Sequence, residues 1–120
     1  MPRKPPPLLH DVYDLTLALY KLVPTFPKAQ RFVLGQRIEH TALEVLFGVE
    51  GANAAGARLA SLARASRGLD ELRLLLRLAR DLGFVSIDRH ESLSIQLDAA
   101  GRKLGGWLKW AQVEQASASG

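Results

Sequence analysis

Four stretches of the chain repeat apolar residues at alternating spacings of three and four, and this repeat limits the fold more than any other feature. Such spacing places apolar side chains on one stripe of an α-helix. The most regular stretch carries the set Leu62, Ala65, Leu69, Leu72, Leu76 and Ala79. Each stretch therefore predicts an amphipathic helix that buries one side against its neighbours.

Turn residues divide the first half of the chain. The first helix is predicted from Leu8 to just before Pro24, because a residue that precedes proline disfavours the helical conformation. Thr25 is predicted to cap a second helix, with Pro27 in its first turn and an end near Gly48. A connection this short favours antiparallel packing of the two helices.

The second half predicts two more helices. Residues 48–56 contain three glycines and predict a loop, and a third helix follows from about residue 57 to Leu82, with Gly83 as its stop. Gly68 lies inside that helix, where glycine costs about 1 kcal/mol relative to alanine, so it marks either a close helix contact or a weak point. Asp88, with Glu91 three residues later, predicts the cap of a fourth helix that ends near Val113.

These segments predict an all-α, up-down-up-down four-helix bundle over residues 8–114. A disordered, basic, proline-rich tail is expected at residues 1–7 and a flexible tail at residues 115–120. A length of 120 residues leaves room for one domain with an ordinary hydrophobic core.

Several classes of function are excluded or disfavoured. The chain has no cysteine, which excludes disulfides, thiolate metal sites and thiol nucleophiles. His10, His40 and His90 fall on three different predicted segments, with no spacing that puts two metal ligands on one helical face. No apolar run reaches the roughly 20 residues of a membrane span, and no signal peptide is recognisable. We therefore expect a cytoplasmic, non-enzymatic protein without cofactor, metal or membrane partner.

The charge of the chain favours polyanionic partners. Lysine and arginine total 16 against 12 acidic residues, giving a net charge of +4. Arg73, Arg77 and Arg80 are spaced by four and three, so they form one cationic stripe on the third helix. Asp70 and Asp81 stand at ion-pair spacing from Arg73 and Arg77, so the same stripe could be a solvated, ion-paired face. The residues alone leave both interpretations open.

Leu74 and Leu78 lie off the apolar stripe of the same helix. One bundle core cannot cover both sides of a helix, so these leucines predict a contact between subunits of a homo-oligomer. Two isolated exposed leucines are the alternative.

Three segments carry a resemblance to a known family. They are residues 26–37 (FPKAQRFVLGQR), 69–82 (LDELRLLLRLARDL) and 101–109 (GRKLGGWLK). Together they resemble the accessory variability determinant (Avd) proteins of diversity-generating retroelements, in the right order and spacing over most of the chain. The chain is similar, less closely, to the four-helix-bundle proteins encoded by intervening sequences in large-subunit ribosomal RNA genes.

The Avd resemblance implies a basic, ring-shaped homopentamer of four-helix bundles. It also implies binding of RNA or DNA and association with the retroelement reverse transcriptase, which copies a template RNA into mutagenised cDNA. The accessory protein itself would be non-enzymatic. By position, the cationic candidates for nucleic-acid or polymerase contact are Arg31, Arg37, Arg73, Arg77, Arg80, Arg102 and Lys109. The alternative is a stand-alone bundle protein of the intervening-sequence group, whose molecular role is unknown.

Overall fold

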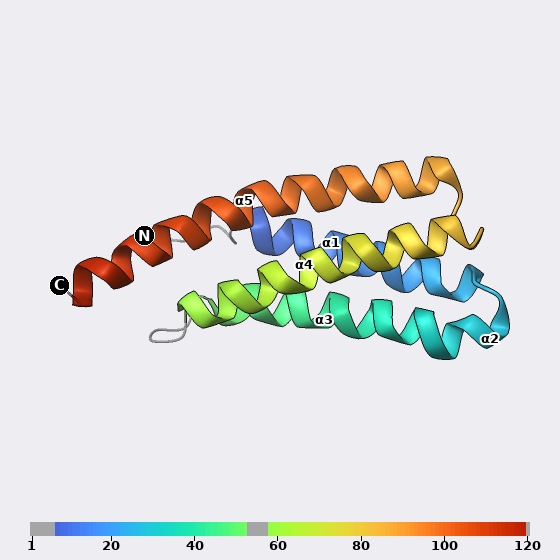
Figure 1. The fold of residues 1–120 in the computed structure, drawn as a ribbon, viewed down its shortest axis with the longest axis horizontal. Coiled ribbons are helices and arrows are strands. Elements are labelled where there is room, and N and C mark those ends of the chain that lie inside the picture. Colours follow the sequence, from blue (N-terminus) through green and yellow to red (C-terminus); the bar gives the residue numbers. More distant parts are fainter. Residues whose placement is uncertain (1–6, 53–57, 120) are drawn as a thin grey trace.

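A computed structural model of the chain describes residues 7–52 and 58–119. Its four long helices are α1 (Pro7–Leu22), α3 (Gln36–Gly51), α4 (Arg58–Asp81) and α5 (Ile87–Ser119). Three short elements connect α1 to α3: the 3-10 helix η1 (Val23–Thr25), α2 (Lys28–Gln30) and the π-helical turn η2 (Arg31–Gly35). The long helices pack side by side, each antiparallel to the next (Figure 1). The prediction of an all-α chain with four packed helices is confirmed.

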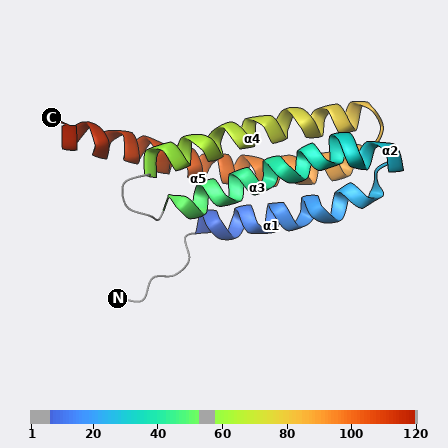
Figure 2. The same ribbon diagram turned by 90° about the horizontal axis from the view of Figure 1, so that it is seen from below.

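The four long helices enclose one core. α1 packs against α3 and α5, and α4 also packs against α3 and α5, so helices adjacent in sequence are neighbours in space (Figure 2). The predicted apolar stripes supply the buried side chains. The largest fully buried ones include Leu15, Leu19, Ile38, Leu62, Leu72, Leu76, Leu93, Leu97 and Leu104. Across the described part of the chain, no helix is both long and apolar enough to cross a membrane.

The connection between α1 and α2 differs from the prediction. The Thr25 hydroxyl donates a 2.6 Å hydrogen bond to the Leu22 carbonyl, so Thr25 closes η1 and does not cap the next helix. Pro27 occupies the N-cap position, where no side chain caps the helix. The predicted cap was wrong because the chain makes a 3-10 turn after α1, and this turn uses the threonine.

The connection between α4 and α5 is partly as predicted. Gly83 stops α4 with a φ of 83°, and the amides of Gly83 and Phe84 donate to the carbonyls of Arg80 and Ala79 at 2.9 and 2.8 Å. The cap of α5 is Ser86, whose hydroxyl accepts a 3.1 Å bond from the Arg89 amide. Asp88 was the wrong choice because the helix begins one residue before it, at Ile87.

Two helices are longer than predicted. α3 continues past Gly48 to Gly51, and α5 continues past Val113 to Ser119. Residues 115–119, expected to be a flexible tail, are therefore helical in the structure. At this end Arg58 of α4 contacts α5: its guanidinium lies 5.2 Å from the Trp110 ring centroid and 3.3 Å from Glu114. Residues 1–6 of the expected amino-terminal tail, residues 53–57 of the second loop and residue 120 lie outside the described residues.

Candidate nucleic-acid interface

An arginine that crosses from α4 to α5 fixes how these two helices align. The Arg73 guanidinium donates to the Asp98 carboxylate at 2.5 Å and to the Leu97 carbonyl at 3.3 Å. The side of α5 that carries Asp98 therefore faces α4. Arg102 follows Asp98 by four residues and Lys109 follows Arg102 by seven, so both lie on that same side. We call the set Arg73, Arg77, Arg102 and Lys109 the α4/α5 cationic face.

The cations of this face are not equivalent. Arg73 is held by α5, whereas Arg77, Arg102 and Lys109 are exposed and form no ion pair with any described residue. Arg80 also lies on this side of α4, but its guanidinium pairs with Asp81 at 2.9 Å. Three cations of the face are therefore available to a phosphate, and two arginines of the predicted stripe are engaged within the chain.

The two intrahelical ion pairs of the alternative interpretation, Asp70 with Arg73 and Arg77 with Asp81, are not formed in the described residues. Asp70 does not pair with Arg73, because that arginine reaches Asp98 on the neighbouring helix. Asp81 does not pair with Arg77, because it accepts hydrogen bonds from Arg80. The interpretation of the stripe as a face joined by intrahelical pairs is therefore wrong for Arg77.

A shallow groove of about 350 Å³ runs between α4 and α5 beside this face. Arg73 and Arg102 line it together with two carboxylates, Asp70 and Asp98. Those carboxylates repel a phosphate inside the groove, so the favourable positions for a phosphate lie along its rim, at the unpaired cations.

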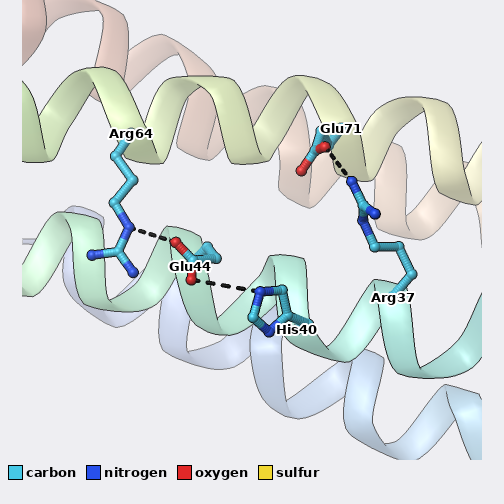
Figure 3. A network of polar contacts seen from close by, with 5 residues as sticks. All are labelled: Arg37, His40, Glu44, Arg64 and Glu71. Carbon is cyan, nitrogen blue, oxygen red and sulfur yellow. Dashed lines mark hydrogen bonds and ion pairs between the residues drawn. The ribbon is translucent and has the colours of Figure 1, made fainter.

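The remaining predicted cations lie elsewhere. Arg31 donates to the Phe26 carbonyl at 3.0 Å and so supports the turn before α2. Arg37 of α3 pairs with Glu71 of α4 at 2.8 Å (Figure 3). The seven predicted residues therefore do not form one site, because Arg31 and Arg37 have local structural partners away from the α4/α5 cationic face.

The second arginine pair in Figure 3 also joins α3 to α4. Arg64 donates to Glu44 at 2.6 Å, and His40 lies 3.7 Å from the other oxygen of that carboxylate. The hydrogen bond from Arg64 lowers the pKa of Glu44, and the same bond raises the pKa of Arg64. Arginines on this side of α4 therefore hold helices together.

The predicted oligomer residues are exposed. Leu74 and Leu78 retain 68% and 47% of their accessible surface. The Arg37–Glu71 pair shows which residues of α3 and α4 lie side by side. Because the two helices are antiparallel, Val33, one turn before Arg37, lies beside the turn of α4 that follows Glu71. Val33 and Leu82 are also exposed. We call the set Val33, Leu74, Leu78 and Leu82 the leucine patch.

Sequence reasoning missed several exposed cations and several partners. Arg67 of α4, Arg89 of α5 and Lys21 of α1 are exposed and have no ion pair among the residues described. Asp98 and Glu71, which hold Arg73 and Arg37, lie 25 and 34 positions away from them. No local spacing could identify these partners.

No cluster of side chains that could hold a metal ion is found in residues 7–52 and 58–119. The three histidines lie on α1, α3 and α5, and no group of three or more histidine, aspartate or glutamate side chains there could hold a metal ion. The described surface offers charge and apolar contacts.

Comparison with protein families agrees with this description. The model of the bAvd-like family matches residues 8–111, which include nearly all of the described bundle. The chain belongs to the bAvd-like family. These are the Avd proteins of diversity-generating retroelements, generally non-catalytic accessory proteins, so membership implies an accessory role. No curated protein matches the chain.

Proposed function

We propose that this Avd-family chain binds nucleic acid and the retroelement reverse transcriptase, and so supports cDNA synthesis during diversity generation. The observation that carries the proposal is the position of Arg77, Arg102 and Lys109, unpaired within the described residues, along one edge between α4 and α5. Cations without an internal ion pair can replace the counterions of a phosphate backbone. The release of these counterions is the main source of affinity in sequence-independent binding.

The mode of binding follows from the residue types on this face. Lysine and arginine contact phosphates, and helices without a groove-reading motif supply no base-specific contacts. Binding is therefore non-specific in sequence and weakens steeply with salt. The reverse transcriptase would bind the same RNA and cDNA, and the accessory protein would hold these polyanions beside it.

The proposal includes a homo-oligomer, with the pentamer of the Avd resemblance as the expected form. The exposed leucine patch supports it, because a contiguous apolar surface on a small domain is typical of an interaction site. An oligomer would also repeat the three unpaired cations by symmetry, and many phosphate contacts would then act together.

A titration with single-stranded RNA and DNA tests the proposal. The affinity of the parent protein is expected to fall by orders of magnitude between 50 and 200 mM salt, if the oligomer makes about 6 to 10 phosphate contacts. A variant with Arg77, Arg102 and Lys109 all changed to glutamine should bind far more weakly at low salt and keep its helicity, since glutamine is a good helix former. Affinity that ignores salt, or equal binding by parent and variant, would contradict the proposal.

Association with the reverse transcriptase is tested by co-elution of this protein and the enzyme, both purified, with and without nuclease. Co-elution that survives nuclease treatment indicates direct contact between the proteins. No co-elution in either condition would contradict this part of the proposal.

A further inference from the structure

A second apolar surface lies on the side of the bundle formed by α1 and α3. Tyr13, Leu17 and Tyr20 are spaced by four and three, so they share one side of α1, and they retain 56%, 44% and 39% of their accessible surface. This side is turned away from the buried Val12 and Leu15. The core of the described chain therefore leaves a row of two aromatic rings and a leucine uncovered.

Phe47 of α3 extends this row onto the neighbouring helix. A Cβ added at Gly35 would lie 2.5 Å from Val23, so the residue just before α3 lies against the residue just after α1. The two helices are antiparallel, so Phe47, twelve residues after Gly35, lies near the level of Tyr13. Phe47 retains 55% of its accessible surface. We call the set Tyr13, Leu17, Tyr20 and Phe47 the aromatic patch.

The two apolar patches carry different charges at their margins. Glu39 and Glu50 lie on the α1 side of α3, beside the aromatic patch, and Lys21 follows Leu17 by one turn of α1. None of the three forms an ion pair within the described ranges, so the two carboxylates outnumber the one cation. On α4, within two turns of Leu74, Arg67 and Arg77 form no ion pair with a described residue. The same stretch has a single carboxylate without an ion pair, Asp70, so the unpaired cations outnumber it. The margin of the aromatic patch therefore carries a net negative charge, and that of the leucine patch carries a net positive charge.

We propose that the aromatic patch is the surface that receives the leucine patch of a second copy of this chain. The inference rests on the oligomer of the proposed function and names the other half of its contact. Aromatic side chains are enriched at the centres of protein interfaces, where they insert between aliphatic side chains. The acidic margin of one copy meets the basic margin of the next, which favours this pairing over either patch with itself.

The positions of the patches determine the symmetry of this contact. The aromatic patch spans α1 and α3. The leucine patch lies on α4 and extends to Leu82, just after α4, and to Val33 in η2, just before α3, so the two patches occupy adjacent sides of one bundle. A contact between different surfaces is heterologous, and repeated copies close into a ring when the rotation between them permits it. Each subunit uses both patches, so loss of either one breaks every contact in the ring.

Two variants and their mixture test the inference. Leu17→Glu disables the aromatic patch and Leu78→Glu disables the leucine patch, because each would bury a charge in the contact. Each variant alone is expected to sediment as a monomer with unchanged helicity by circular dichroism. An equimolar mixture is expected to sediment at twice the monomer mass, because the intact leucine patch of Leu17→Glu binds the intact aromatic patch of Leu78→Glu. Phe47→Ala provides a milder second variant of the aromatic patch if Leu17→Glu lowers the helicity.

The outcomes separate this inference from the proposed function. A monomeric parent protein would overturn the inference and the oligomer of the proposed function, and would leave the binding of nucleic acid to its own titration. If Leu17→Glu and Phe47→Ala keep the parent mass while Leu78→Glu becomes monomeric, the oligomer stands and the aromatic patch has another occupant, such as the reverse transcriptase. A mixture of folded variants that stays monomeric also overturns the heterologous contact.

Discussion

The glycines at the contact between α3 and α4 differ from Gly105 and Gly106 of α5 in what surrounds them. Toward α3 the helices are in close contact: a Cβ added at Gly48 would lie 2.9 Å from the Ser61 carbonyl oxygen, and one at Gly68 would lie 2.5 Å from Val45. On α5, a Cβ added at Gly105 or Gly106 meets nothing within 4 Å. The first two glycines allow the close contact between α3 and α4, whereas the other two weaken a helix without any packing benefit inside the subunit.

Arginine shows a more limited contrast, because arginines join α4 to both of its neighbours. Arg37 and Arg64 join α3 to α4 through ion pairs of 2.8 and 2.6 Å. Arg73 and Arg58 join α4 to α5 through ion pairs of 2.5 and 3.3 Å, but Arg77, on the Arg73 side of α4, has no ion pair with a described residue. The α4/α5 side therefore carries an arginine that is available for a ligand in addition to the arginines that hold the helices together.

The largest effect is expected at Gly48. In Gly48→Ala the added methyl group meets a backbone carbonyl, which can move only if α3 and α4 separate. Overpacking of this kind costs about 1 to 3 kcal/mol, so the midpoint of urea unfolding should fall. An unchanged midpoint would show that α3 and α4 do not lie this close.

The opposite sign is expected at Gly105. Gly105→Ala should raise the free energy of unfolding by about 0.5 to 1 kcal/mol, because alanine is the better helix former and nothing blocks its side chain. Urea unfolding beside Gly48→Ala provides the comparison. A loss of stability would mean that another subunit packs closely against this part of α5.

The sequence predicted the helices well and their contacts poorly. The alternating spacing identified side chains such as Leu72 and Leu97, which are buried, because burial follows helical periodicity. The caps at Thr25 and Asp88 were wrong because a start displaced by one or two residues changes which side chain reaches the free amides.

The candidate site shows a similar limit. The spacing of Arg73 and Arg77 correctly placed both on one side of α4, but their different states depend on Asp98, which lies on another helix. That partner is set by the register between α4 and α5, which is a property of the packed bundle. The spacing of residues within one helix does not determine this register.

The smallest effect is expected at Glu44. Its pKa is lowered by the hydrogen bond from Arg64, so the folded state gains stability while the carboxylate is charged, and loses that gain as the pH falls through the lowered pKa. Glu44→Gln should therefore be slightly less stable than the parent at pH 7, with a difference that shrinks below about pH 4.5. Thermal unfolding of both proteins across this range measures the difference. A gap that persists in acid would assign the effect to packing.

Two arginines of α5 test the central claim most directly. Arg102 lies on the side of α5 that faces α4. Lys103 pairs with Asp11 of α1 and so marks the side of α5 that faces α1. Arg89 precedes Lys103 by about four helical turns and therefore lies on this α1 side. Both are exposed, neither has an ion pair with a described residue, and replacement by glutamine changes the net charge equally. The measurement is the slope of log affinity for single-stranded RNA against log salt. Arg102→Gln is expected to lower the slope by about one for each phosphate contact that Arg102 makes in the bound complex. Arg89→Gln is expected to leave the slope unchanged. Equal losses in both variants, or a larger loss for Arg89→Gln, would contradict the assignment of the α4/α5 cationic face.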